Sequence, residues 1–134
     1  MNRFLTAKHA ALAGISVLLV ACNPLKAFDP VMITDDQLFA VRAMDVNSST
    51  TGTTTYDWVN SQTQATVHHA TITRGAGSAS IRITDPAGTL VYSSALLPDR
   101  KEPTLKGLPG NWKVVVTMTG YTGTLGFEIV AKAP

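Results

Sequence analysis

Strict alternation of apolar and polar residues over Ser78–Thr84 is the feature that most constrains the fold of this chain. Three aliphatic side chains fall on one side of the segment and the polar ones on the other, as in a half-buried β-strand. The turn sequence Asp85–Gly88 follows, with proline at the second position and glycine at the fourth, as a type I turn prefers. Thr89–Leu97 then supplies a partner strand, so Ser78–Leu97 is predicted to form an antiparallel hairpin.

Other parts of the chain show the same combination of β-prone residues and turn signals. The further predicted strands are Gln37–Val46, Thr53–Val59, Ala65–Thr73, Trp112–Met118 and Leu125–Ile129. The predicted turns between them are Asn47–Gly52, Gly75–Gly77 and Gly120–Gly123. Pro98–Pro109 is predicted as a loop, charged and solvated at Asp99–Glu102, with a short edge strand at Thr104–Lys106.

No amphipathic helix is evident after the predicted signal peptide, and turn signals recur at short intervals. This pattern predicts an all-β domain, a single antiparallel β-sandwich or jelly roll of about seven or eight strands. The predicted domain covers residues 37–134 and follows a signal helix and a tether.

The amino terminus has the organisation of an export signal. Arg3 and Lys8 precede the uncharged run Ala10–Ala21, which is shorter than the roughly 20 apolar residues that a membrane-spanning helix needs. Asn23-Pro24 then ends the helical pattern. The sequence therefore predicts a signal peptide at 1–21 and a tether, beginning with the processed residue, at 22–36.

The sequence Leu19-Val20-Ala21-Cys22 resembles the lipobox of bacterial lipoproteins, and Cys22 is the chain's single cysteine. The resemblance implies cleavage between Ala21 and Cys22, diacylglycerol on the Cys22 sulfur and, usually, acylation of its new amine. The expected location is the bacterial cell envelope, with the chain attached to a membrane through that lipid. Asn23 stands where aspartate would resemble an inner-membrane retention signal, which favours the outer membrane. The alternative is an ordinary secretory signal beside an incidental cysteine.

Charge gives no support to nucleic-acid binding. The chain has 11 Lys and Arg against 9 Asp and Glu, but Arg3 and Lys8 belong to the predicted signal, which leaves nine of each sign (11 − 2 = 9). Nucleic-acid binding needs a concentrated basic face. No nucleic-acid partner is predicted.

Catalytic and metal-binding patterns are not evident. His68 and His69 are adjacent, so on a regular strand they point to opposite faces and cannot chelate one ion. Gly77-Ser78-Ala79-Ser80 lacks the closing glycine of a nucleophile elbow. We therefore predict no enzyme, no metal and no cofactor. A small envelope hydrolase would need one of these histidines beside a serine and an acid.

Three aromatic residues are candidates for ligand contact. Tyr121 is predicted to be exposed at a hairpin tip, and Trp58 and Tyr92 are candidates to stack on a sugar or peptide. Trp112 is assigned to the core because it begins an apolar face. A carbohydrate-binding module, the alternative function, would require at least two of the three candidates on one exposed face.

The segments Gly107–Val116 and Gly123–Ile129 are similar to the closing hairpin of small jelly-roll modules, the pre-peptidase carboxy-terminal and GOLD-like domains. That resemblance implies a non-catalytic binding or accessory module. The function predicted from the sequence is a membrane-anchored interaction module. Its expected partner is an envelope protein, peptidoglycan or a glycan.

Overall fold

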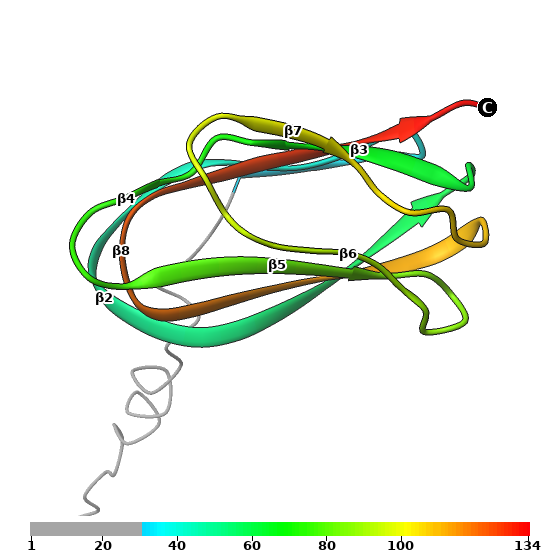
Figure 1. Ribbon diagram of the computed structural model, residues 1–134. Helices are drawn as coiled ribbons and strands as arrows, with labels where there is room; N and C mark the ends of the chain where they lie inside the picture. The colour runs from blue at the N-terminus through cyan, green and yellow to red at the C-terminus, as the bar shows by residue number, and fades with distance from the viewer. Residues whose placement is uncertain (1–30) are drawn as a thin grey trace, which may run out of the picture.

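The computed structural model describes residues 31–134, and these form an antiparallel sheet that curls into a sandwich (Figure 1). The predicted signal peptide, lipobox and first part of the tether lie outside the described residues. The strands are β1 (Val31–Thr34), β2 (Leu38–Asn60), β3 (Gln64–His69), β4 (Ile72–Thr73), β5 (Ser78–Thr84), β6 (Leu90–Ala95), β7 (Arg100–Pro103) and β8 (Gly110–Lys132). The all-β prediction is confirmed, with no helix among the described residues.

Two 23-residue strands, β2 and β8, organise the fold. They pair antiparallel from Leu38 opposite Val130 to Asn60 opposite Gly110, with register shifts between Val41 and Met44 and on either side of Thr50. Both strands bend at one end of the molecule, so each contributes to both layers (Figure 1). The first layer contains β1, the first part of β2, the last part of β8, β3 and β7. The second contains the rest of β2 and β8 with β5 and β6.

The bend in β8 requires glycine. Gly123 has a φ of 152°, and a Cβ there would lie 2.1 Å from the Ile72 carbonyl oxygen. Across the ladder, Thr50 remains paired with Tyr121, so the strands curve together instead of separating. Such irregularities bend a strand and increase its twist.

Two predicted turns are therefore wrong. Asn47–Gly52 is not a loop between strands, and Gly120–Gly123 is not a hairpin turn but a bend inside β8. The closing hairpin on which the jelly-roll resemblance relied is absent, because β8 passes from one layer to the other and its partner throughout is β2. Residues typical of turns serve here to bend a continuous ladder.

The hairpin predicted over Ser78–Leu97 is confirmed as β5 and β6, with Ile81 opposite Ser94. The prediction for Pro98–Pro109 needs correction, since the strand is β7 and lies earlier than Thr104–Lys106. The charged residues Arg100–Glu102 of β7 extend the first layer by pairing with β3. The predicted strand Ala65–Thr73 is divided into β3 and β4.

The predicted tether extends too far toward the carboxyl end. Within it, β1 pairs with β2, and Asp35 closes the turn between them by accepting hydrogen bonds from the backbone of Gln37 and Leu38. The Trp58 indole donates to the Asp35 carbonyl at 2.7 Å. The sheet therefore already includes Val31–Thr34.

The core fills the space between the layers. Trp58 and Trp112 lie opposite each other on β2 and β8 and pack edge to face, with ring centroids 6.0 Å apart. Phe39 of the first layer contacts Tyr56 of the second and also Phe127. The prediction that Trp112 belongs to the core is confirmed. Aromatic pairs of this kind contribute about 0.5–1.5 kcal/mol beyond the burial of their area.

Candidate functional site

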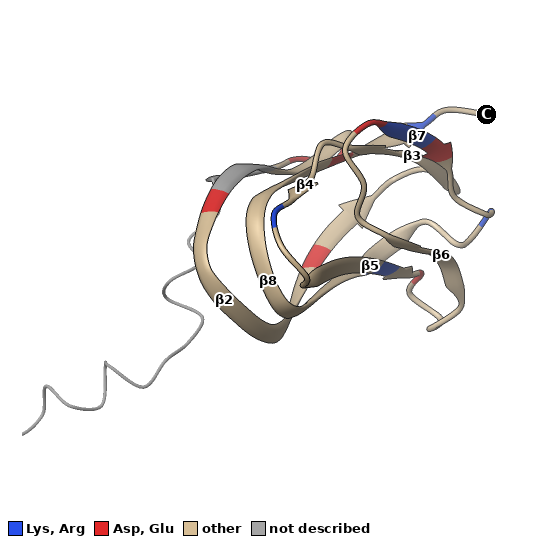
Figure 2. Ribbon diagram, turned by 60° about the vertical axis from the view of Figure 1, so that its left-hand side comes forward, with Lys and Arg blue, Asp and Glu red and all other residues tan. Residues whose placement is uncertain are grey.

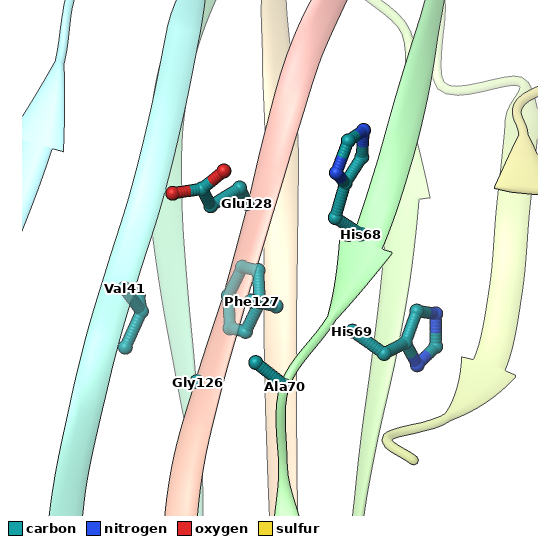
Figure 3. Close-up of a pocket in the computed structure, with 7 residues that line it drawn as sticks. All are labelled: Val41, His68, His69, Ala70, Gly126, Phe127 and Glu128. Carbon is teal, nitrogen blue, oxygen red and sulfur yellow. The ribbon is translucent and has the colours of Figure 1, made fainter. Parts of the chain in front are cut away.

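A hollow of about 370 Å³ opens on the outer face of the first layer, over β2, β8 and β3 (Figure 3). It exists because Gly126 has no side chain and Ala70, beside it, has a small one; Ala70 N–H donates to the Gly126 carbonyl at 3.0 Å. His68 and Glu128 stand next to it as opposed residues on β3 and β8. The other lining residues are Val41, His69 and Phe127.

The side chains of His68 and Glu128 point in different directions (Figure 3). Opposed residues of neighbouring strands have Cβ atoms about 4.5–5.5 Å apart, within reach of each other. The Glu128 carboxylate nevertheless leans toward β2, away from the His68 ring (Figure 3). The seven lining residues include no serine, threonine or cysteine, so the hollow holds no side-chain hydroxyl or thiol nucleophile.

The neighbouring histidine, His69, points to the other side of β3, toward β7 (Figure 3). His68 is half-buried, whereas His69 is buried at 5% exposure. Its Nε2 lies 2.7 Å from the Tyr92 hydroxyl, which donates to Glu102 Oε2 at 2.8 Å. Leu97 N–H donates to His69 Nδ1 at 3.2 Å. Glu102 also forms an ion pair with Arg100. The polar chain His69–Tyr92–Glu102 thus joins β3, β6 and β7.

These contacts assign the protonation state of each group. Because His69 Nδ1 accepts from a backbone N–H, the neutral ring carries its proton on Nε2 and donates it to Tyr92. Burial lowers the pKa of His69. Burial, reinforced by the Glu102 carboxylate, raises the pKa of Tyr92 to about 12. The Tyr92 hydroxyl, followed by Arg100, lowers the pKa of Glu102.

Both nitrogens of His69 are occupied by hydrogen bonds, and the residue is 5% exposed. A general base must reach the proton that it abstracts. Among the described residues no group of three His, Cys, Asp or Glu side chains could hold a metal ion. Nor does this part of the chain contain a helix long and apolar enough to cross a membrane.

The aromatic residues predicted to contact a ligand are in the interior. Tyr121 is fully buried, where a hairpin tip would have exposed it, because β8 does not turn back at Gly120. Trp58 is 1% exposed and belongs to the tryptophan pair, and Tyr92 is 9% exposed and belongs to the polar chain. The structure brings none of the three to a shared outer face.

Sequence reasoning missed the residues that shape these sites. Glu102 was assigned to a solvated loop, and Gly126 and Glu128 were not singled out. Alternation along the predicted strands shows which side of each strand His68 and Glu128 face. It does not show which residue of β8 lies opposite His68. Charge is mixed over the surface as well: in the view of Figure 2 neither sign forms a continuous stripe along the strands.

The sequence matches no protein-family model, and a search of curated proteins finds no relative. One similar solved structure is a glycoside hydrolase family 43 arabinoxylan arabinofuranohydrolase from Bacillus subtilis, in complex with cellotetraose. The two chains are 17% identical with a TM-score of 0.28, and the match covers 76% of this chain and 20% of that chain. This chain therefore spans about a fifth of that enzyme, and a likeness at this level supports no inference about activity.

Proposed function

We propose that this chain is a lipoprotein of the bacterial envelope, anchored through lipid on Cys22, whose β-sandwich serves as a non-enzymatic interaction module. The observation that carries the proposal is the position of the chain's single cysteine. It directly follows an uncharged run and closes the lipobox-like sequence Leu19–Cys22. A cysteine whose sulfur carries lipid leaves no free thiol in an oxidising compartment.

The anchor would fix the location of the domain. Each buried methylene contributes about 0.8 kcal/mol, and stable attachment takes two or more chains, as in a diacylglyceryl group. The sandwich begins at Val31, so residues 23–30 separate it from the lipidated residue. Extended chain spans at most about 3.3–3.6 Å per residue, which keeps the start of the sheet within about 30 Å of the anchor.

The absence of enzymatic activity is part of the proposal. The hollow beside His68 offers no nucleophile, and the interior histidine is held by hydrogen bonds on both nitrogens. The expected partners are an envelope protein, peptidoglycan or a glycan. The carbohydrate-binding alternative has lost the aromatic platform on which it depended, because Trp58, Tyr92 and Tyr121 are buried.

Anchoring is tested by expressing the full chain and its Cys22→Ser variant in a bacterial host and separating membrane from soluble fractions. The unchanged chain is expected in the membrane fraction, with intact mass showing a cleaved amino terminus plus acyl groups. The variant should lose both the added mass and the membrane association. Ser16→Ala, in the apolar run but outside Leu19–Cys22, is the matched control and should behave as the unchanged chain.

An unmodified thiol at Cys22, or native material released free into the medium, would contradict the proposal. The module's role is tested separately by affinity capture from detergent-solubilised envelope, with isolated peptidoglycan and soluble glycans as parallel arms. A stoichiometric partner in one of these arms supports an interaction module. Turnover of an ester, amide or glycosidic substrate by the purified chain would overturn the non-enzymatic assignment.

A further inference from the structure

Large apolar side chains are exposed unevenly over the described part of the sandwich. The exposed ones are Val59, Ile72, Leu90, Leu105 and Leu108, with exposed fractions between 39% and 69%. Leu90 begins β6 just after the β5–β6 turn, Leu105 and Leu108 lie in the β7–β8 loop, and Val59 is next to the end of β2. The β5–β6 turn and the β7–β8 loop lie at the same end of the sandwich, on the right in Figure 1. We call the end that carries Leu90, Leu105 and Leu108 the leucine end.

Backbone contacts place these three leucines near one another. Leu105 N–H donates to the Val91 carbonyl at 2.8 Å, which puts Leu105 beside the start of β6 and therefore beside Leu90. Leu108 N–H donates to Asp85 Oδ2 at 2.9 Å, in the turn that leads into the same strand. The leucine end thus combines residues from two chain segments.

The loop that presents Leu105 and Leu108 is fixed along its length. Thr104 N–H donates to the Ala65 carbonyl, Gly107 N–H donates to the Thr63 carbonyl, and the Trp112 indole donates to the Leu108 carbonyl at 2.7 Å. The backbone therefore holds Leu105 and Leu108 outward, at 69% and 56% exposure. Such clustered exposed apolar side chains mark interaction surfaces.

The occupant is identified by the composition of the loop and by the reach of the chain. Exposed Lys106 lies between Leu105 and Leu108, and aliphatic side chains with a lysine whose stem is apolar and whose tip is charged suit the headgroup region of a bilayer. β1 ends at Thr34, about 10–13 Å along the strand from Val31. Residues 23–30, which can span about 30 Å, are long enough for the leucine end to face the membrane.

Away from Val59, the outer face of the second layer is polar. It presents exposed hydroxyls at Thr53, Thr55, Ser80 and Ser93, which suit water. We propose that the leucine end rests on the lipid headgroup region, so that the anchored domain stands on the bilayer in one orientation. This inference rests on the proposed lipid anchor.

The test uses the lipidated full chain with a single added cysteine, because lipid on Cys22 leaves the new thiol as the reactive one. Leu105→Cys and, in a second variant, Leu108→Cys carry an environment-sensitive fluorophore after reconstitution into phosphatidylethanolamine–phosphatidylglycerol vesicles. Ser80→Cys is the matched control on the outer face of the second layer. The leucine-end labels should shift to the blue and lose most of their emission to spin-labelled lipid, whereas the Ser80 label should do neither.

Equal quenching at the leucine end and at Ser80, on vesicle-bound and lipidated protein, overturns the inference and leaves the anchor intact. A blue shift in native membranes that disappears in pure lipid vesicles also overturns it, because the occupant is then a protein. If mass spectrometry shows that Cys22 is unmodified, the proposed anchor fails. The same labels on a Cys22→Ser background then decide the inference: quenching on added vesicles supports it and no quenching overturns it.

Discussion

The two layers of this sandwich are joined in two different ways. At one end, β2 and β8 pass from layer to layer as continuous paired strands that bend together near Thr50 and Gly123. Along the β6–β7 edge, no strand ladder crosses between the layers among the described residues. Single backbone hydrogen bonds, such as Thr71 N–H to the Leu97 carbonyl, and the polar chain His69–Tyr92–Glu102 link them instead. The first connection is a continuous ladder that depends on steric fit, whereas the second includes side chains whose hydrogen bonds depend on protonation.

This difference predicts which changes affect which connection. The bend should be sensitive to any added atom and insensitive to pH, because its hydrogen bonds are between uncharged backbone groups. The polar chain should respond to pH, because it contains His69, and burial lowers the pKa of that histidine below its ordinary value. A variant of the apolar core provides the reference loss of stability with which the effects on the bend and on the polar chain are compared.

Trp112→Ala is expected to have the largest effect, because it removes a fully buried ring from the core together with its contact to Trp58. The loss in the free energy of unfolding should be about 3–5 kcal/mol, measured by urea denaturation followed by circular dichroism. Val115→Ala on the opposite face of the same strand should cost much less. Equal losses would show that the interior does not hold the layers together.

Gly123→Ala breaks the backbone connection directly. The new Cβ would meet the Ile72 carbonyl oxygen and the Tyr121 hydroxyl, and the φ of 152° disfavours alanine. We expect a loss of about 2–3 kcal/mol in the same assay. Gly75→Ala, also at positive φ but with no atom within 4 Å of the new Cβ, separates the steric part from the backbone part and should cost less. A Gly123→Ala chain as stable as the Gly75→Ala chain contradicts the assignment of the bend.

The end opposite the bend depends on Asp85, whose carboxylate accepts from the backbone of Ala87, Thr89 and Leu108. These bonds, led by that of Leu108, lower its pKa below 3.8. The stability that they provide is present above pH 3.8 and is lost as pH falls through the folded pKa. Asp85→Asn should lower Tm by several degrees at pH 7 and should abolish the loss of stability that Asp85 causes at acid pH. Asp99→Asn, on an exposed residue, should leave Tm unchanged; matching melts for the two variants would contradict the role of Asp85.

The smallest effect is expected from titration of the polar chain. Burial lowers the folded pKa of His69 below the unfolded value of 6.5, so the unfolded chain takes up the proton first. Stability is therefore full above about pH 6.5 and declines as pH falls toward the folded pKa, because protonated Nδ1 would face the Leu97 N–H.

The measurement is Tm between pH 7.5 and 5, values chosen to bracket the ordinary histidine pKa of roughly 6.5. Both the unchanged chain and His68→Gln should lose stability over this interval. His69→Gln should have a lower Tm at pH 7.5 and a flatter profile, since glutamine can accept from Leu97 and donate to Tyr92 without titrating. An unchanged slope in His69→Gln would assign the pH dependence to another group.

The comparison also explains what could be predicted from the sequence. Alternation gave the strand class, the Ser78–Leu97 hairpin and the opposite directions of His68 and His69, because strand geometry fixes side-chain direction locally. The bend could not be predicted, since glycine and threonine are used both in turns and in bent strands. Only the pairing of Thr50 with Tyr121 distinguishes the two. The position of Tyr121 was wrong for the same reason.

The polar chain could not be predicted either. His69, Tyr92 and Glu102 come from three different strands and have no characteristic spacing in the sequence. Their contact depends on β3 and β7 being neighbours in the sheet. Proximity across a sheet edge is set by register, which one sequence without a structure leaves undetermined.

The composition of β7 has a consequence for crowded conditions. An edge strand has unpaired backbone N–H and C=O groups that can hydrogen-bond to a strand of another copy. Repeated pairing of this kind leads to aggregation. β7 reads Arg100-Lys101-Glu102-Pro103, so two like charges and a proline without an N–H occupy the position where a second molecule would attach. Copies concentrated on one membrane would therefore not associate through edge-to-edge pairing of β7.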